Sequence, residues 1–570
     1  MAGNSQKPKG ACTLVLFLAN CKEKAMRSFS TIILLLLFCH TFSSAQRTIG
    51  LFLNDSSSFD GYTLLAPTSS NSCYLIDNCG RQVHTWASST RGSGSTYLLE
   101  DGRLLRTGFV PNSNFFGGGS SGRIELIDWS GALLWGYNYS NDTVYSHHDV
   151  EYLPNGNILV LAWEYRSEEA AIANGRDPED ISTPIWPEQI VELQPVGNDE
   201  ANIVWEWHLW DHLIQDFDST KANYGVVAEH PELVDINYSA RSGDPDWIHA
   251  NSVAYNAELD QIIINSRDFD EFWIIDHSTT TSEAAGHSGG RWGKGGDLLY
   301  RWGNPMTYQR GDIEDRRLFM QHDVHWIPDS LPDGGKIMVY NNGLNRPDGN
   351  FSSIDILTPP TDAQGNYRLI TGQPYGPSQL DWTYQPAAPN TFFSPITSGA
   401  QRLPNGNTLI CIGIDGELLE VDAQQQLVWR YINPVRQVPF PQGEAPFGNG
   451  LFRAYRYPPE YPAFNGRLLI PGDPIELDPL PLPEDCQPTS TEDAPEALAL
   501  QLFPNPIVDQ LYLQFNGKDG LPMQVISTAG QVVWSGELRA GDMEINSGHW
   551  PPGLYILTVD QQYFFKLIKT

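Results

Sequence analysis

The sequence is poor in basic residues and rich in acidic ones. Its 570 residues include 35 Lys and Arg against 68 Asp and Glu, which gives a formal net charge of −33. A chain with this excess of negative charge repels nucleic acid and anionic lipid surfaces, so we exclude both as partners.

Long hydrophobic stretches are also scarce. The apolar run at residues 31–39 is too short to span a bilayer, which argues against a membrane anchor. It follows the basic residue Arg27 and precedes Ser43-Ser44-Ala45, an organisation typical of a cleavable secretory signal. We therefore predict a signal peptide at 1–45, with 1–25 as a candidate upstream extension, and no transmembrane segment in the mature chain.

Cysteine is rare, and only Cys73, Cys79, Cys411 and Cys486 follow the predicted signal. Cys73 and Cys79 flank a tight loop and could pair in an oxidising compartment. Cys411 lies in an apolar strand, where we expect it to be buried. None of these cysteines has zinc-ligand spacing, so we predict no metal site and no cofactor.

Glycine, proline and tryptophan are abundant, at 51, 41 and 17 residues, which favours strands and tight turns over helices. Two kinds of hairpin alternate along the chain. The first ends near a tryptophan and recurs at 74–86, 124–135, 190–207, 272–302, 354–382 and 418–429. The second lies between these copies, at 97–109, 148–163, 249–267, 322–342 and 398–414.

Two hairpins make one four-stranded blade, so the six tryptophan hairpins predict an all-β fold with a six-bladed β-propeller at residues 46–485. A sheet sandwich is the alternative architecture. Residues 486–498 are polar and acidic, as in a linker, and alternating strands at 499–570 predict a small β-sandwich. We expect one helix, near residues 229–235.

Three histidines occupy equivalent positions in repeated strands. His148 and His322 each begin a His-Asp-Val strand with a proline six residues later, and His249 begins a looser third copy. If the repeats are blades of one ring, the three histidines converge at one mouth of its central channel. Ser398 and Gly94 fill the equivalent position elsewhere, and this asymmetry is expected of a catalytic site on a repeat scaffold.

Strand alternation places His322 on one face of its strand and His325 on the other. We therefore expect His325 to pack between sheets. The same alternation sends Asp149 and Asp323 away from His148 and His322, which argues against a metal held by these His-Asp pairs.

Arg267 ends the hairpin that begins at His249, so the antiparallel return brings it beside His249 and Asn251. An arginine among histidines at a channel mouth forms a pocket for a tetrahedral oxyanion, whereas a salt bridge to a neighbouring aspartate is the alternative. Two glycine-rich stretches lack the context that their motifs require. They are a nucleophile-elbow pattern at 118–122 and a phosphate-loop pattern at 289–296.

At these residues the sequence resembles the bacterial aryl-sulfate sulfotransferase family. The resemblance covers roughly residues 60–460 and rests on Trp247-Ile248-His249-Ala250-Asn251-Ser252, Ser266-Arg267 and Gln321-His322. It implies a six-bladed propeller that transfers a sulfuryl group from an aryl sulfate ester to a phenolic acceptor, without a nucleotide donor or cofactor. It gives catalytic or substrate-binding roles to His322, His148, His249, Arg267 and Asn251. Among these, His322 would be the nucleophile that becomes transiently sulfated. The likeness departs at His325, which adds a nearby histidine, and in the C-terminal blade, where we assign the last substrate-binding contribution to Arg453.

Residues 502–570 resemble the C-terminal sorting domain of Bacteroidetes proteins exported by the type IX secretion system. The Pro504-Asn505-Pro506 opening, the Gly553-Leu554-Tyr555 strand and the basic tail carry this likeness. It implies the secretion machinery as a partner, and a location in the medium or at the cell surface.

Two other functions fit the same residues. One is a lyase or hydrolase that uses the same histidines, and a bound metal would favour it. The other is a surface propeller that binds aromatic or sulfated glycans without turning over an aryl sulfate.

Overall fold

The computed structural model describes residues 46–570 except 181–182, 239–242, 387, 389–390, 468, 484–485, 487–499, 516–519, 528–529 and 561–562. The predicted signal peptide at 1–45 and most of the predicted linker lie outside the described residues. The described chain is built mainly from antiparallel strands, with one short parallel pair and two short α-helices, which confirms the all-β prediction. Neither helix is long and apolar enough to cross a membrane.

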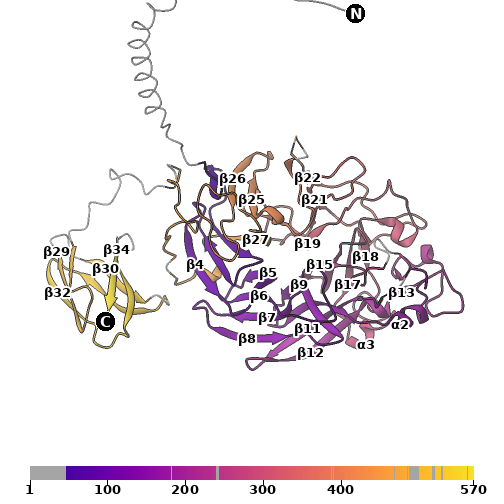
Figure 1. Cartoon of the computed structure of the whole chain (residues 1–570), viewed down its shortest axis with the longest axis horizontal. Coiled ribbons are helices and arrows are strands. Elements are labelled where there is room, and N and C mark those ends of the chain that lie inside the picture. The colour runs from indigo at the N-terminus through magenta and orange to yellow at the C-terminus, as the bar shows by residue number, and fades with distance from the viewer. Residues whose placement is uncertain are drawn as a thin grey trace, which may run out of the picture. The chain divides into compact units, whose positions relative to one another are not determined.

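Six antiparallel sheets of four or five strands occupy the first part of the described chain. Four of them are made of consecutive hairpins, as the alternating pattern predicts (Figure 1). Their strands are β5 (Gly92–Leu98), β6 (Leu104–Phe109), β7 (Gly122–Ile127), β8 (Leu133–Asn138); β9 (Val144–Tyr152), β10 (Ile158–Glu164), β11 (Glu188–Val196), β12 (Glu200–His208); β15 (Ala250–Asn256), β16 (Gln261–Ser266), β17 (Glu271–Asp276), β18 (Tyr300–Trp302); β19 (His322–Trp326), β20 (Ile337–Asn341), β21 (Ser353–Leu357), β22 (Trp382–Tyr384).

The other two sheets join strands from the two ends of this region. β1 (Gly50–Asn54) pairs with β26 (Leu427–Ile432), at the edge of a sheet that also contains β25 (Glu417–Val421), β24 (Thr408–Ile412) and β23 (Gly399–Arg402). β27 (Leu451–Tyr457) pairs with β2 (Tyr62–Pro67), which continues into β3 (Ser72–Ile76) and β4 (Gln82–Ala87). The last sheet is therefore completed by a strand from far along the chain, because Thr63 of β2 pairs with Arg456 of β27, 393 positions later.

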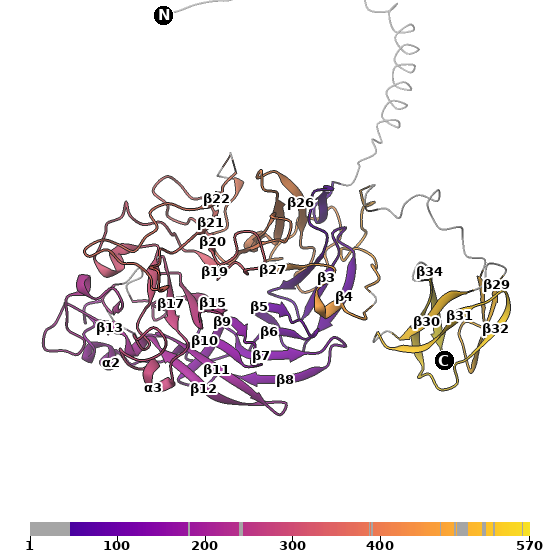
Figure 2. The same cartoon turned by 180° about the vertical axis from the view of Figure 1, so that it is seen from behind.

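The first strands of the six sheets contact one another in a closed series. β5 contacts β9, which is followed by β15, β19, β23 and β27, and β27 contacts β5 again. Figure 2 shows β5, β9, β15, β19 and β27 from behind, with β8, β12 and β22 lying further out. Functional side chains at the start of these inner strands are thereby brought close together.

Apolar residues fill the spaces between successive sheets. Six buried clusters each draw their members from two neighbouring sheets, including the pair formed by the first and last sheets. Strands such as β10 and β16 are buried along their whole length, which explains their continuous apolar runs.

The recurring tryptophans connect neighbouring sheets through their indole N–H groups. Trp135 donates to Glu200 O at 2.8 Å, and Trp207 donates to Gly296 O at 2.7 Å. Trp302 and Trp429 make the same kind of bond to backbone oxygens associated with the next sheet. The repeat in the sequence therefore marks both a strand end and a contact between sheets.

Cys73 and Cys79, which the sequence left as a possible pair, are not bonded to each other. Cys79 instead pairs with Cys486, and Cys73 and Cys411 are free and buried, as expected for Cys411. Cys73 belongs to the apolar cluster between β2–β4 and the β5–β8 sheet, whereas Cys79 belongs to the cluster on the other side. The two side chains therefore face opposite sides of one sheet, and the five residues between them do not bring them together.

The helix predicted near residues 229–235 is also wrong. The segment contains a 3₁₀ turn, η2 (Val227–Glu229), and β14 (Val234–Asp235), which pairs with β13 (Leu213–Ile214). Pro231 lies between them, and its missing N–H interrupts a helix. The helices present are α2 (Glu168–Ala173), α3 (Thr281–Ala284) and the 3₁₀ turns η1 (Leu209–Asp211), η3 (Pro305–Tyr308), η5 (Gly413–Asp415) and η6 (Pro462–Phe464).

The C-terminal region forms two further antiparallel sheets. One contains β28 (Leu500–Phe503), β29 (Gln510–Phe515) and β32 (Gly541–Asn546). The other contains β30 (Leu521–Ser527), β31 (Val532–Leu538), β33 (Gly553–Val559) and β34 (Tyr563–Lys569). Both contribute to one buried cluster whose members all lie between residues 500 and 567, so this region has a core of its own.

Candidate active site

The three histidines lie where their strands depart from regular geometry. His148 and His249 have positive φ, at 52° and 50°, and Asp323 beside His322 has a φ of 55°. The ladders of β9, β15 and β19 with their partners each contain a register shift. A bulge re-aims the side chains around it, so simple alternation does not describe these strand openings.

His148 is held by a chain of two further side chains. Its Nδ1 lies 2.9 Å from Nδ1 of His147, and His147 Nε2 lies 2.8 Å from Oε2 of Glu188. Burial, followed by the charge of His249, lowers the pKa of His148 well below its ordinary value. Burial lowers the pKa of His147 to about 3, so both rings are neutral near pH 7.

Burial also raises the pKa of Glu188 well above its ordinary value. Its other oxygen, Oε1, accepts the backbone N–H of Ala250 at 2.8 Å, which leaves Oε2 as the oxygen that faces His147. Glu188, His147 and His148 therefore form a buried hydrogen-bonded series that ends at His148 Nε2.

His249 lies beside His148 but has a different charge. The centroids of the two rings are 4.9 Å apart, and His249 Nδ1 lies 2.5 Å from Oδ2 of Asp246. Burial alone would lower the pKa of His249, but the charge and hydrogen bond of Asp246 outweigh it and the pKa is raised. Of the three predicted histidines, His249 is thus the one that most readily carries a proton.

His322 is oriented by Asn342. Its Nδ1 lies 2.7 Å from Asn342 Oδ1, an acceptor, because the Asn342 amide nitrogen donates to Ser394 O and Thr397 O. The proton of the neutral ring is therefore on Nδ1, and Nε2 accepts the N–H of Thr397 at 3.1 Å. Burial, then the charge of Arg267, holds the pKa of His322 well below its ordinary value.

Arg267 lies across the hairpin from His249, as predicted. Ala250 pairs with Ser266, and the N–H of Asp268 donates to Ile248 O, so Arg267 lies opposite His249. Its Nη1 donates to Asp268 Oδ1 at 2.7 Å. Its charge contributes to the lowered pKa of both His148 and His322, which assigns all four residues to one electrostatic cluster.

Asn251 and Arg453 are buried, and their polar groups bind the protein itself. Asn251 donates to Gln321 O at 2.9 Å and accepts from Asn265. Arg453 forms ion pairs with Asp149 at 2.9 Å and Asp323 at 3.2 Å, and donates to Asn251 O. These contacts tie the strand openings of His148, His249 and His322 to one another.

A glycine-rich loop covers the histidines. Gly119, with a φ of 71°, accepts the N–H of His148, and a Cβ at this position would overlap the imidazole ring of His148. A Cβ on Gly118 would approach Cε1 of His249 to 3.2 Å. The loop that resembles a nucleophile elbow therefore packs against two of the predicted site residues.

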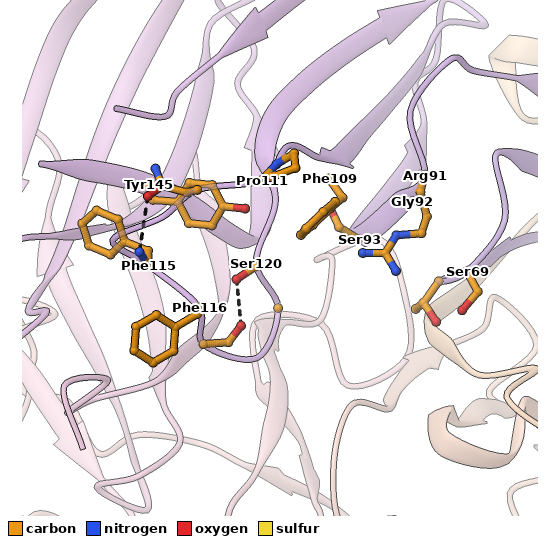
Figure 3. Close-up of a pocket in the computed structure, with 14 residues that line it drawn as sticks. Ser69, Arg91, Gly92, Ser93, Phe109, Pro111, Phe115, Phe116, Ser120 and Tyr145 are labelled. Carbon is orange, nitrogen blue, oxygen red and sulfur yellow. Dashed lines mark hydrogen bonds between the residues drawn. The ribbon is translucent and has the colours of Figure 1, made fainter. Parts of the chain in front are cut away.

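The other side of this loop lines a cavity of about 480 Å³ (Figure 3). Phe109, Phe115, Phe116 and Tyr145 supply aromatic rings to its wall, and Arg91 lies near its edge. The Ser120 hydroxyl donates to Gly117 O at 2.7 Å and closes the loop on itself. An aromatic, partly cationic cavity thus lies next to the buried histidines.

His325 does not pack between sheets as predicted. It lines a second cavity of about 850 Å³ with Glu151, Tyr255 and Trp326, residues at the far ends of the inner strands. Its Nδ1 contacts the backbone oxygen of Asp323 at 3.1 Å, and its side chain is 21% exposed. A register shift between His322 and His325 breaks the alternation of β19, and His325 lines a cavity.

Several polar residues of this cluster carry no sequence motif. They are His147, Glu188, Asp246, Asn342 and Thr397. His147 directly precedes His148, and Asp246 lies three residues before His249. The remaining partners come from other strands or loops. The signal that could have found His147 is its position in the same repeated strand.

Comparisons with known proteins identify the two parts of the chain. Residues 54–433 match the profile of the family described as Arylsulfotransferase (ASST), and residues 501–569 match the Secretion system C-terminal sorting domain. A search of curated proteins found no match. The sorting domain directs the chain to the cell surface or the medium and implies the secretion machinery as a partner.

Solved structures similar to this chain are distant in sequence. A protein of unknown function from Bacteroides caccae is 11% identical, with 70% of this chain and 98% of that chain covered and a TM-score of 0.38. A catalytically inactive variant of virginiamycin B lyase from Staphylococcus aureus is 9% identical, with coverages of 70% and 88% and a TM-score of 0.32. The periplasmic gluconolactonase of Pseudomonas aeruginosa is 11% identical, with coverages of 65% and 94% and a TM-score of 0.34.

The profile match spans most of the region that forms the six sheets and includes His148, His249, Arg267 and His322. The family implies aryl substrates and supports aryl sulfotransfer as the general activity. The chain therefore belongs to the arylsulfotransferase family.

Proposed function

We propose that the protein transfers a sulfuryl group from an aryl sulfate ester to a phenolic acceptor through a sulfated His322. The observation that carries this proposal is the pairing of a neutral, oriented His322 with two cations, Arg267 and His249, in one buried cluster. Neutral imidazole is a nucleophile that needs no prior deprotonation. The cations offset the charge of a sulfuryl group that is moving between oxygen and nitrogen.

In the first step, His322 Nε2 attacks sulfur, a nitrogen–sulfur bond forms and the sulfur–oxygen bond to the aryl group breaks. The N–H of Thr397, which donates to Nε2 in this structure, moves to a sulfuryl oxygen. Asn342 Oδ1 accepts a hydrogen bond from the Nδ1–H group and stabilises the positive charge that develops on the ring. In the second step, a phenol oxygen attacks sulfur and the nitrogen–sulfur bond breaks.

His148 supplies and recovers the phenol proton. When Glu188 is protonated, three protons can move in series. The Glu188 proton passes to Nε2 of His147, and the Nδ1 proton of His147 passes to Nδ1 of His148. The Nε2 proton of His148 then passes to the departing phenolate. Both histidines are neutral before and after this shift, and the charge appears on Glu188. In the second step the incoming phenol gives up its proton, and the three transfers run in reverse. Glu188 therefore stores the proton between the two steps, a role that its raised pKa suits.

The remaining predicted residues have supporting roles in this proposal. Asn251 and Arg453 position the strand openings through their contacts with Gln321, Asp149 and Asp323. The aromatic cavity beyond Gly119 receives the aryl group of the donor or acceptor. Movement of the glycine-rich loop then gives it access to His148 and His322.

We also propose that the six sheets are the blades of a six-bladed β-propeller, and that the C-terminal region is a β-sandwich. The closed contact series of the inner strands supports the ring. The single core shared by the two C-terminal sheets supports the sandwich.

The test is a two-part reaction of the secreted protein with p-nitrophenyl sulfate. Donor alone should release a burst of nitrophenol, and a phenol should restore steady turnover. After a basic quench, mass spectrometry should find the sulfuryl mass on His322. His322→Ala should abolish burst and turnover, whereas His325→Ala should keep both.

A sulfuryl group on His325, or near-normal turnover by His322→Ala, would refute the covalent mechanism. Binding of the donor without any turnover would favour the non-enzymatic propeller.

A further inference from the structure

A second cluster of titratable side chains lies away from the histidines of the proposed active site. His212 follows η1, whereas His287 and Asp297 belong to the long connection between β17 and β18. The Nδ1 atoms of His212 and His287 each lie 2.8 Å from the same oxygen, Asp297 Oδ1. One potential ligand atom from each residue lies within 4.8 Å of the others.

The hydrogen bonds of His212 restrict its tautomer. Its Nε2 lies 2.8 Å from the backbone oxygen of Ala284, which can only accept, so Nε2 carries a proton. In a neutral ring the lone pair is then on Nδ1, and it faces a carboxylate oxygen at 2.8 Å. Two facing lone pairs repel, so a proton or another cation must lie between these atoms.

The surroundings of His212 favour a cation held by several ligands. His212 is fully buried, and Trp207 stacks on its ring with centroids 5.6 Å apart. His287 directs a second nitrogen at the same carboxylate oxygen, which a single bridging proton would not require. His277 provides the contrasting case, because its two nitrogens face two different carboxylates, Glu192 and Asp260.

We propose that His212, His287 and Asp297 bind a divalent transition-metal cation such as Zn²⁺. Imidazole nitrogen and carboxylate oxygen are ligands that zinc accepts, and three protein ligands leave one position for water. Ala284 acts from outside the ligand set, because its bond to Nε2 fixes the tautomer that presents Nδ1 to the metal. Bond lengths of ~2.1 Å around a tetrahedral ion separate ligand atoms by ~3.3 Å, so binding widens the present contacts by about half an ångström.

Such a site joins two insertions that no strand ladder connects directly. The His212 segment follows the last strand of the β9–β12 sheet, and the other ligands come from the next sheet. The bound cation would hold these insertions together at a distance from the proposed sulfuryl-transfer site. It is expected to affect stability rather than turnover.

The experiment uses the secreted full-length protein without an affinity tag, after treatment with EDTA and removal of the chelator. Titration calorimetry with ZnCl₂ should show one bound equivalent and a rise in melting temperature. CoCl₂ should give visible d–d absorption, which reports a nitrogen- and oxygen-bound ion.

His287→Ala and Asp297→Asn should each weaken Zn²⁺ binding at least ~10-fold. The side chain of His287 is 62% exposed, so its removal does not threaten folding. His230→Ala is the matched control, because His230 is an exposed histidine of the same region that pairs with Glu232 instead. It should bind Zn²⁺ like the unmodified protein, and all three variants should turn over p-nitrophenyl sulfate normally.

Two results would overturn the proposal. One is the absence of Zn²⁺ binding, which would leave a protonated His212 as the cation between the two atoms. The other is equal affinity in the unmodified protein, His287→Ala and Asp297→Asn.

Discussion

Neighbouring side chains give the histidines of the proposed site different protonation states. Asp246 raises the pKa of His249, while burial and nearby cations lower the pKa of His148 and His322. One cluster thereby contains neutral rings for nucleophilic and proton-transfer roles beside a cationic ring for an anionic substrate. The same residue type serves all these purposes because its ordinary pKa lies near neutrality.

These shifts predict the pH dependence of turnover. His322 must be neutral, which holds above its lowered pKa, and His249 must be protonated, which holds below its raised pKa. We expect kcat/KM for p-nitrophenyl sulfate to fall on the alkaline side as His249 loses its proton. Asp246→Asn should move the alkaline limb to lower pH and reduce kcat/KM at neutral pH by ~10²-fold.

The measurement is a pair of pH–rate profiles, with thermal melts to establish that the variant is folded. Superimposable profiles of the two proteins would contradict the role given to Asp246.

Gly119 provides a second prediction at this scale. Gly119→Ala should reduce kcat/KM by ~10²-fold or more, because its Cβ would displace the ring of His148. The matched control is Gly131→Ala, whose φ is also positive, at 89°, but whose Cβ would meet no atom within 4 Å. It should cost about 1–2 kcal/mol of stability through backbone strain and leave turnover unchanged. Equal activity of the two variants would show that the loop contact has no catalytic consequence.

At the scale of strands and loops, Cys79 and Cys486 fasten the proline-rich segment after β27 to the turn between β3 and β4. Cys486→Ala should lower the free energy of unfolding by about 2–5 kcal/mol, because the disulfide restrains a very long loop of the unfolded chain. Peptide mapping without reduction should recover Cys79 linked to Cys486, and reduced unmodified protein should melt like the variant. Recovery of Cys73 linked to Cys79 would contradict the structure.

The repeating hairpins were predictable from sequence because each depends on local turns and on a tryptophan that recurs at the equivalent position in every sheet. Features that depend on distant partners were not. Cys486 lies 407 residues from Cys79, and nearness in sequence favoured Cys73 instead. The predicted face of His325 failed because a bulge breaks the alternation on which that prediction depended.

The candidate site divides in the same way. The hairpin that begins at His249 placed Arg267 correctly, because pairing within one hairpin follows from sequence. Asn342 and Glu188 reach the histidines from other strands or their ends, so only the assembled sheets reveal them.

At the scale of the whole molecule, the chain has separate cores for separate tasks. The cores between the six sheets use residues up to Cys486, and the core of the sorting domain uses residues 500–567. A chain that ends shortly after Cys486 should keep turnover within about twofold, because it retains every proposed site residue and the disulfide. It should remain inside the cell envelope, because it lacks the sorting domain.

Assays of cell fractions and of the purified shortened protein check both parts of this prediction. A folded but inactive shortened protein would show that the two regions are not independent.

The pairing of β27 with β2 also sets an order in time. β2 is among the first strands made, yet its partner is Leu451–Tyr457, close to the end of the six-sheet region. Until that late segment arrives, one hydrogen-bonding edge of β2 has no strand beside it and is open to mispairing. A chain that ends before β27 therefore lacks both the partner strand of β2 and Arg453, which lies on that strand.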